Sequence, residues 1–272
     1  MKNAKVLFVQ QEISPYIKDA EMSMSERNLP QGILEKNNEI RIFMPRFGCI
    51  NERRNQLHEV IRLSGMNLII NDADHPLIIK VASLPKARMQ IYFIDNDDFF
   101  THRKATVFDS NGKFFEDNDD RMVFFGRGVL EAIKKQNWAP NIVSCSGWMT
   151  ALVPLFVKKA YSDNPLFSDT KVIYTICNDD FEGCFRDGFN KRAEMPGITP
   201  KDTKNIKKDV SYITLQKFAI DNSDAIIFGS EKINPVLEKY AKSTKKPILP
   251  YQTRENIIDA YSDFCDQYVL NK

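Results

Sequence analysis

The sequence contains no apolar run that approaches the roughly 20 residues needed to cross a bilayer. Its start, MKNAKVLFVQQE, holds too short an apolar stretch for a secretory signal. The five cysteines are scattered, and no two have the CxxC spacing of zinc or redox motifs. We therefore expect a soluble cytoplasmic protein whose thiols are reduced and mostly buried.

An excess of charge of either sign is also missing. The chain has 38 basic and 36 acidic residues, which leaves a formal net charge of +2. This balance gives no electrostatic reason to expect nucleic acid or an anionic membrane as a partner. The hydrophobic share of 43% over 272 residues is enough for a sizeable core. No internal repeat, low-complexity stretch or clear linker divides the chain.

The first residues alternate between strand and helix patterns. Residues 4–10 (AKVLFVQ) form a nearly continuous apolar run, which is typical of a strand buried on both faces. A helical segment follows over residues 22–36, and residues 40–44 (IRIFM) predict a second strand. This β-α-β unit favours a parallel sheet with crossover helices.

The rest of the chain adds three features to this pattern. Four short β-type runs (VIRLSG, MNLIIND, PLIIKVASL and MQIYFID) indicate a β-rich insertion at about 58–95. The polar stretch at 178–206 is long for an ordinary connection and indicates a functional loop or lid. A last helix is expected at 254–270. The predicted architecture is a single α/β domain over residues 1–272, with a doubly wound, Rossmann-like parallel sheet.

One strand-to-helix turn, NIVSCSGWMT at residues 141–150, lies where α/β proteins place ligand chemistry. It begins like a buried parallel strand and passes through small residues into an apolar helix. It carries no basic residue and no group that titrates near neutrality, and Cys145 is its one reactive side chain. The turn therefore has the position of an active site without the usual chemistry.

Seven segments, in order along the chain, carry a family resemblance. They are FVQQEISPYIK, LPQGILEKNNEIRIFMPRFGCI, YFIDNDDFF, DNDDRMVFFGRGVLEAI, PNIVSCSGWMTALVPLF, YTICNDDFEG and LQKFAIDNSDAIIFGS. The fifth, for example, resembles a Pro-Asp-Val-Val-His-x-His-Asp-Trp-His-Thr-Ala-Leu-Val-Pro motif. Together they resemble the N-terminal domain of bacterial glycogen synthases and plant starch synthases, from the first strand to about Ser230.

The resemblance implies one Rossmann-like half of a GT-B fold. It also implies descent from glucosyltransferases of glycogen metabolism that extend an α-1,4-glucan from ADP-glucose, with no separate cofactor and no metal. The chain stops shortly after the first of the two GT-B domains, so we expect the C-terminal nucleotide-binding domain to be lacking. The last helix is then expected to cover the face that a second domain needs.

The first departure from the family lies in its Lys-Thr-Gly-Gly-Leu turn, whose glycines let backbone N–H groups approach the diphosphate of ADP-glucose. Here the segment reads Lys18-Asp19-Ala20-Glu21-Met22. The lysine is kept and both glycines are replaced. Glu21 opposes a diphosphate by charge and by bulk, unless an arginine or lysine folds against it.

The second departure removes imidazole. At the positions of the family's His-x-His-Asp-Trp-His-Thr segment the chain has Ser144, Ser146, Gly147, Trp148, Met149 and Thr150, and a further family histidine is replaced by Cys177. All three histidines of the chain lie elsewhere. Methionine and cysteine cannot hold the donor sugar or stabilise the transition state as imidazole does. We expect no catalytic residue here and no transferase activity for the isolated chain.

Several polar groups persist at former cleft positions: Glu12, Lys18, Asp95, Asn118, Arg121, Trp148, Thr150 and Asn178. One interpretation makes them an acceptor-sugar or small-ligand site, in which Trp148 stacks on a glucose ring. The other interpretation is that they hold loops together, as Asn118 and Arg121 can at the start of a helix.

Other reactive groups give weaker signals. Cys145 and Cys177 have no neighbouring histidine to activate a thiol, so we expect both to be buried and inert. The acidic cluster of Asp179, Asp180 and Glu182 is more typical of solvated charge than of a metal site. The basic run KDTKNIKKD (201–209) is likewise expected to be a solvated face.

Two hypotheses of different classes remain open. The first is a glycogen/starch synthase-like glucosyltransferase that acts with a separate second-domain subunit. The second is a non-catalytic descendant that binds an α-glucan, ADP-glucose or a protein partner, including a second copy in a homodimer. The lost motifs favour the second for the chemistry, whereas the chain-wide resemblance favours the first as ancestry.

Overall fold

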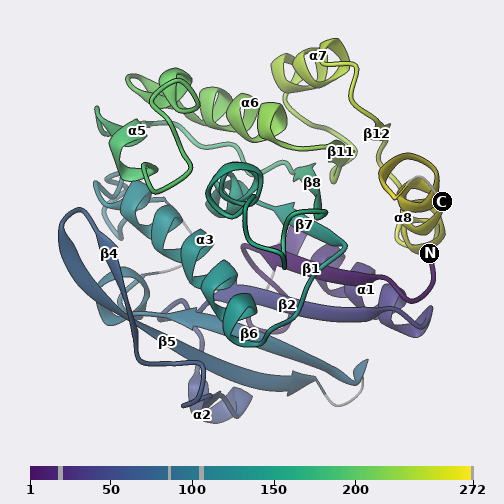
Figure 1. Ribbon diagram of the computed structural model, residues 1–272, viewed down its shortest axis with the longest axis horizontal. Helices are drawn as coiled ribbons and strands as arrows, with labels where there is room; N and C mark the ends of the chain where they lie inside the picture. The colour runs from purple at the N-terminus through teal and green to yellow at the C-terminus, as the bar shows by residue number, and fades with distance from the viewer. Residues whose placement is uncertain (18–20, 85–86, 104–106, 271–272) are drawn as a thin grey trace.

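The computed structural model describes residues 1–17, 21–84, 87–103 and 107–270, with side chains throughout except at 21–26. A large sheet with seven parallel strands runs through the middle of this part of the chain (Figure 1). In spatial order they are β12 (Ile248–Leu249), β11 (Ala225–Phe228), β8 (Lys171–Ile176), β7 (Ile142–Ser146), β1 (Lys5–Gln10), β2 (Glu39–Pro45) and β6 (Met89–Asp95). This is the doubly wound α/β fold that the opening pattern predicts.

The direction of winding reverses beside β1. The chain first moves outward from β1 through β2 to β6, and later moves the other way from β7 through β8 and β11 to β12. β1 and β7 are parallel neighbours, with Val6 opposite Ile142 and Gln10 opposite Ser146. In open α/β sheets, ligands bind in the crevice outside the carboxyl ends of the strands at such a switch point.

The β-rich stretch extends this sheet with antiparallel strands. β5 (Ala73–Leu84) pairs with β6, while β4 (Met66–Ile70) and β3 (His58–Glu59) both pair with β5. The β4–β5 hairpin turns at Asn71 and Asp72, whose φ values of 51° and 61° suit a tight two-residue turn. The strand predicted in VIRLSG is wrong, because residues 61–63 form a turn.

Short helices precede and follow these strands. α2 (Glu52–Asn55) lies before β3, and η2 (Asp97–Thr101) follows β6. The segment predicted as a polar loop contains β9 (Cys184–Phe185), α5 (Phe189–Arg192) and η5 (Lys204–Ile206). β9 pairs antiparallel with β10 (Val210–Ser211), outside the main sheet.

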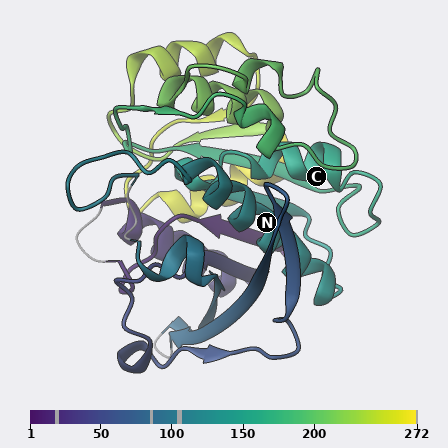
Figure 2. The ribbon, with the colours of Figure 1, turned by 90° about the vertical axis from the view of Figure 1, so that its left-hand side faces the viewer.

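Helices cover both faces of the main sheet, as Figures 1 and 2 show from two directions. One face carries α1 (Glu21–Glu35) and α8 (Ile257–Phe264), which η6 (Cys265–Val269) continues. The other face carries α3 (Asn118–Lys135), η3 (Trp148–Thr150), α4 (Val153–Leu155), η4 (Phe156–Ala160) and α6 (Tyr212–Asn222), and α7 (Pro235–Ser243) packs against α6.

The C-terminal helix α8 packs tightly on the sheet and on α1. A Cβ atom at Gly32 would overlap the Ile258 side chain, so α1 approaches α8 at a position that requires glycine. Tyr261 is fully buried, and its ring lies 6.3 Å from that of Phe8 on β1. α8 therefore lies on a face of the sheet rather than across the carboxyl ends of the strands.

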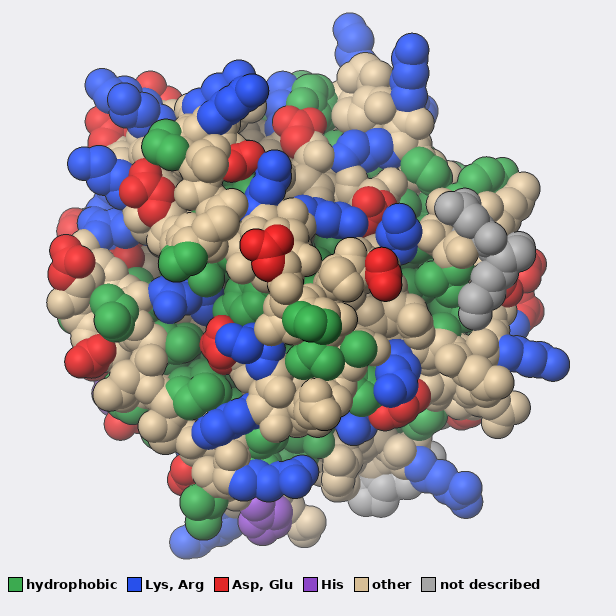
Figure 3. Space-filling view, in the orientation of Figure 1, with side chains coloured by type: hydrophobic (Ala, Val, Ile, Leu, Met, Phe, Trp, Pro, Cys, Tyr) green, Lys and Arg blue, Asp and Glu red, His purple; other side chains and the backbone are tan. Residues whose placement is uncertain are grey.

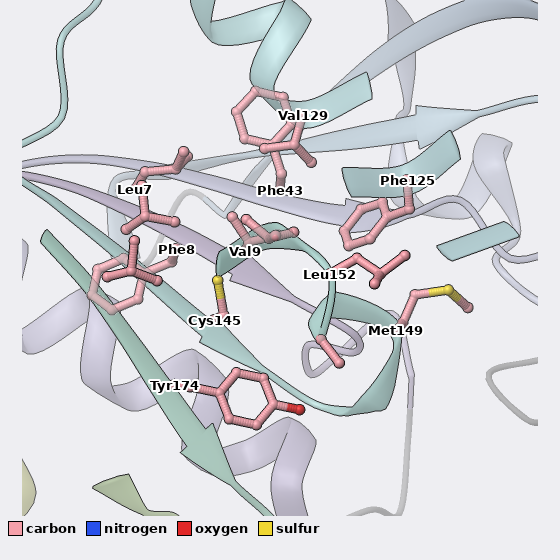
Figure 4. Close-up of a cluster of buried hydrophobic side chains, with 14 of the residues drawn as sticks. Leu7, Phe8, Val9, Phe43, Phe125, Val129, Cys145, Met149, Leu152 and Tyr174 are labelled. Atoms are coloured by element: carbon pink, nitrogen blue, oxygen red, sulfur yellow. The ribbon is translucent and has the colours of Figure 1, made fainter. Parts of the chain in front are cut away.

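The centre of the core lies between β1, β7 and β8 and the helices above them (Figure 4). Its side chains include Leu7, Val9, Phe43, Phe125, Val129, Cys145, Leu152 and Tyr174, all with no exposed surface. Burial of each large apolar side chain of this kind contributes roughly 1.5–3 kcal/mol. This packing holds the carboxyl ends of β1 and β7 in fixed register beneath the switch point.

Candidate functional site

The carboxyl ends of β1 and β7 are joined by main-chain and side-chain hydrogen bonds. The Gln11 backbone N–H donates to the Ser146 carbonyl at 3.2 Å, and the Met149 N–H donates to Gln11 Oε1 at 3.2 Å. The predicted turn at 141–150 therefore lies at the topological switch point. Its side chains from residue 142 onward are buried, including Ser144, Ser146, Trp148, Met149 and Thr150.

Gly147 is the pivot of this turn. Its φ of 84° and ψ of 156° belong to a region that is essentially restricted to glycine. A Cβ atom there would lie 2.6 Å from Gln11 Cβ and 2.8 Å from Gln11 Oε1. The Gly147 carbonyl accepts from the Thr150 hydroxyl at 2.9 Å and from the Tyr174 hydroxyl at 3.4 Å. Glycine is thus required at position 147 by the backbone conformation and the local packing.

Asp179, just beyond β8, fills the space in front of the turn. Its Oδ2 accepts from the Trp148 backbone N–H at 2.9 Å, and its Oδ1 accepts from the Tyr212 hydroxyl at 2.6 Å. Burial raises the pKa of Asp179 above its ordinary value, although the hydrogen bonds from Tyr212 and Trp148 act in the opposite direction. The backbone N–H of Trp148, the first residue of η3, is therefore already hydrogen-bonded to a carboxylate of the protein.

A second carboxyl group, Glu12, lies at the end of β1 and is 8% exposed. Burial raises its pKa from 4.5 to about 7, and the nearby charge of Asp179 acts in the same direction. Two carboxyl groups, Glu12 and Asp179, therefore lie near the carboxyl ends of β1 and β8, and each takes up a proton more readily than a free carboxyl group does.

Trp148 lies inside an aromatic cluster. Its ring centroid is 5.8 Å from that of Phe181 in an edge-to-face arrangement and 6.3 Å from that of Phe185. Phe114, Phe189 and Tyr212 extend the cluster. Trp148 is only 3% exposed, so its ring presents no open face on which a sugar can stack.

The segment that supplies Phe181 and Phe185 is anchored to the start of α3 by buried charges. The Arg186 guanidinium lies 2.5 Å from Asp119 Oδ1 and 2.8 Å from Asp120 Oδ2. The Asp119 side chain has no exposed surface. Burial by itself would lower the pKa of Arg186, but the hydrogen bonds to Asp119 and Asp120 outweigh it and raise that pKa.

Two predicted site residues, Asn118 and Arg121, form a buried pair of their own. Arg121 Nη1 donates to Asn118 Oδ1 at 2.7 Å and Arg121 Nε donates to the Phe99 carbonyl at 3.1 Å, while Asn118 Nδ2 donates to the Val107 carbonyl at 3.0 Å. Burial lowers the pKa of Arg121 to about 10. These contacts bind the loop before α3 to the helix start.

Asp95, at the carboxyl end of β6, belongs to a separate network and is 1% exposed. Its carboxylate lies 3.0 Å from Arg46 Nε and 2.8 Å from Lys80 Nζ, and Glu52 lies 2.7 Å from the same Lys80 nitrogen. Asn178 is exposed, and its backbone N–H donates to Ser230 Oγ at 3.1 Å. The predicted polar residues are thus divided among several places, and Glu12, Trp148, Thr150 and Asn178 lie around the crevice.

The predicted diphosphate turn falls largely outside the described residues. This applies to Lys18, Asp19 and Ala20 and to the side chain of Glu21. The predicted conflict between Glu21 and a diphosphate therefore stays a prediction.

Among the described residues, neither the thiols nor the acidic groups form a second candidate site. Cys145 has no exposed surface, and burial raises its pKa far above that of a reactive thiol. Cys177 is buried as well. Within the described ranges, no three or more His, Cys, Asp or Glu side chains gather as metal ligands. In the same ranges, no helix combines the length and apolar character needed to cross a membrane.

The strand order defines an α/β protein with a doubly wound, mostly parallel sheet. The family model for the starch synthase catalytic domain matches residues 5–247, so the chain belongs to this family. It is 29% identical over 245 residues to a glycogen synthase of Pelodictyon phaeoclathratiforme, a match that covers 88% of this chain and 49% of that protein. It is 36% identical over 177 residues to a glycogen synthase of Chlorobium limicola, covering 65% of this chain and 36% of that protein.

A solved structure shares the fold. The catalytic domain of starch synthase IV from Arabidopsis thaliana, bound to ADP and acarbose, superposes with a TM-score of 0.73 at 16% identity. The superposition covers 94% of this chain and 53% of that one. The chain spans about half the length of the relatives it matches.

Asp179 is the site residue whose role the sequence does not reveal. Its expected character as solvated charge is wrong, because it holds Trp148 and Tyr212. Asp180 also has a partner, since Asn234 Nδ2 donates to its carboxylate at 2.8 Å. These partners are 31 to 54 residues away in sequence, so no local pattern indicates them.

Proposed function

We propose that this chain is a non-catalytic member of the starch synthase catalytic domain family, a pseudoenzyme that binds α-glucan in glycogen metabolism without transferring glucose. The hydrogen bond between the Asp179 carboxylate and the Trp148 N–H carries this proposal. It places a negative group of the chain itself at the turn after β7. The proposed place of action is the cytoplasm.

The electrostatics of the crevice argue against a nucleotide sugar. Glucosyl transfer from ADP-glucose leaves negative charge on a diphosphate, which needs cations or free N–H groups. Of the described residues here, Glu12 and Asp179 present carboxyl groups, and the N–H of Trp148 is already bonded. Because the pKa of Glu12 is about 7, this carboxyl group becomes fully charged only above neutral pH, where it repels a diphosphate.

A neutral glucan does not meet this repulsion. Its hydroxyl groups can donate to carboxylates, so an acidic crevice that rejects a diphosphate can accept a sugar chain. Asn178 and Asp180 are exposed at the end of β8 and are the groups that we propose contact the glucan. Asp95, Asn118 and Arg121 are buried with partners inside the protein, and we propose that their role is structural.

A second candidate function is glucosyl transfer together with a separate subunit or a second copy of the chain. The observation that favours it is the family match over residues 5–247 combined with relatives about twice as long. Groups missing from this crevice would then come from the partner.

Calorimetric titration of the full chain with a maltooligosaccharide, ADP and ADP-glucose tests the proposal. We expect heat from the maltooligosaccharide alone, weakened several-fold in Asn178→Ala and Asp180→Ala. Glu182→Ala, exposed in the same segment, is the matched control and should bind as the wild type. Binding of either nucleotide contradicts the proposal and favours the second candidate. Absence of maltooligosaccharide binding overturns the assignment of α-glucan as ligand.

A further inference from the structure

A second cleft lies on a flank of the molecule, apart from the switch point. It has a volume of about 510 Å³ and lies between the tip of the β4–β5 hairpin, the middle of α3 and α5. In Figure 1 these elements meet at the left-hand side, and Figure 3 shows side chains of both charges on that flank. Three basic side chains, Arg127, Lys191 and Arg192, line the cleft.

The guanidinium of Arg127 is fixed at the hairpin but is not fully paired. Its Nη1 donates to the Ile69 carbonyl at 2.6 Å. Its Nε is buried and has no hydrogen-bond acceptor among the described residues. A buried donor without an acceptor costs about 1–3 kcal/mol. Because this nitrogen has almost no exposed surface, a ligand in the cleft would contact the terminal nitrogens of the Arg127 guanidinium instead.

Arg192 also has donors to spare. Its Nε lies 3.8 Å from Asp119 Oδ2 and 3.7 Å from Asp120 Oδ1, which is beyond hydrogen-bond distance. Arg186 already makes the short contacts to both carboxylates. Within the described part of the chain, Arg192 is thus held in two long ion pairs but makes no hydrogen bond, and its side chain keeps 22% of its surface exposed.

We infer that this cleft binds a small ligand through a phosphate-type oxyanion held by Arg127 and Arg192. A guanidinium presents parallel N–H donors that match two oxygens of a phosphate, and both side chains have donors not used by the protein. Lys191 is exposed at the same cleft and adds a third positive charge. The inference is independent of the function proposed for the switch point.

The remaining polar groups of the cleft narrow the ligand class. Asp72, Asp187 and Glu194 are exposed and also line it. Carboxylates repel a phosphate but accept hydrogen bonds from hydroxyl groups. The combination therefore suits a phosphorylated polyol, whose phosphate contacts the guanidinium groups and whose hydroxyls face the carboxylates, better than it suits free phosphate.

Calorimetric titration of the full chain at fixed ionic strength tests the inference, with inorganic phosphate and glycerol phosphate as probes. We expect both to bind, and glycerol phosphate to bind several-fold more tightly. Arg127→Lys and Arg192→Lys keep the positive charge but lose the parallel N–H donors of the guanidinium. Each should weaken the binding of both probes about tenfold. Arg53→Lys, on the distant helix α2, is the matched control and should change nothing.

The exposed carboxylates provide a second, independent test that does not touch the guanidinium groups. Asp187→Asn removes a nearby negative charge and should tighten phosphate binding about two- to fivefold. Weaker phosphate binding in Asp187→Asn overturns the inference, as does silence with both probes or unchanged affinity in both lysine variants. If inorganic phosphate and glycerol phosphate bind with equal affinity, the cleft binds an oxyanion, and the inference that its ligand is a phosphorylated polyol is contradicted.

Discussion

The Asp179 carboxylate and the Trp148 backbone N–H are joined by a hydrogen bond of 2.9 Å across the ends of β8 and β7. The same carboxylate accepts from Tyr212 on α6, so one side chain ties together two strand ends and a helix. The protein itself thus supplies the hydrogen-bond acceptor for the Trp148 N–H in the turn at the switch point. A ligand anion at this N–H group would have to displace the half-buried carboxylate of Asp179.

Replacement of Asp179 by alanine should destabilise the protein. The change leaves the Trp148 N–H and the Tyr212 hydroxyl without this acceptor, which we expect to lower the free energy of unfolding by about 1–3 kcal/mol. Urea denaturation measures the effect. Glu182→Ala is the control from the same segment, and equal stability of the two variants would show that Asp179 holds nothing together.

Stability should fall as the pH rises through the titration of Glu12. Its pKa is raised from 4.5 to about 7, so the folded protein binds a proton more tightly than the unfolded chain does. The free energy of unfolding should therefore decrease by about 3 kcal/mol between pH 4.5 and 7 from this group. The raised pKa of Asp179 acts in the same direction.

Glu12→Gln separates this contribution from the rest. The variant should be more stable than the wild type at pH 8 and should lose much of the pH dependence, as urea denaturation at pH 5 and pH 8 can measure. The exposed Glu59→Gln variant serves as control and should retain the wild-type profile. A Glu12→Gln variant that is no more stable than the wild type at pH 8 contradicts the expectation.

Gly147→Ala should be far more costly than Gly188→Ala, although both glycines have positive φ values, 84° and 83°. A Cβ atom at Gly188 meets nothing within 4 Å, so this change should cost about 1 kcal/mol for backbone conformation. At Gly147 the clash with Gln11 adds to the strain, for a total of roughly 3 kcal/mol or more. Thermal unfolding of the two variants compares them directly, and similar melting temperatures would rule out close packing at the switch point.

Arg186→Met should loosen the segment that covers Trp148. It leaves Asp119 and Asp120 buried without their short ion pairs, which we expect to cost about 3 kcal/mol. Acrylamide quenching in a Trp138→Phe background reports on Trp148 alone and should rise in the variant. Lys207→Met, exposed in the same segment, is the control. Unchanged quenching would mean that the ion pairs of Arg186 do not hold the segment with Phe181 and Phe185 against Trp148.

Much of the fold follows from local patterns. The strand expected over residues 4–10 is β1 at Lys5–Gln10. The amphipathic pattern of residues 117–136, with its acidic start, likewise predicts a helix, which is α3 at Asn118–Lys135. Continuous apolar runs and an acidic helix start are strong signals because they depend only on near neighbours in sequence. The apolar run after Thr150 is less regular than expected, since it divides into α4 and η4 around Pro154.

The aromatic cluster around Trp148 and the ion pairs that anchor it do not follow from such patterns. Phe181, Phe185 and Phe189 lie in a segment of polar composition, and their ring partners include Trp148 and Phe114, far away in sequence. The ion pairs of Arg186 span 66 and 67 residues. The replacement of the family's histidines and glycines stays a prediction from the resemblance, whereas the contacts of Asp179 and Arg186 are visible only in the structure.

The most direct test of a non-catalytic family member is incorporation of labelled glucose from ADP-glucose into glycogen by the purified chain. A glycogen synthase of the family, assayed in parallel, shows that the assay works. We predict no incorporation above the level without protein. Robust, protein-dependent incorporation would contradict the proposal and show that this crevice supports glucosyl transfer without imidazole.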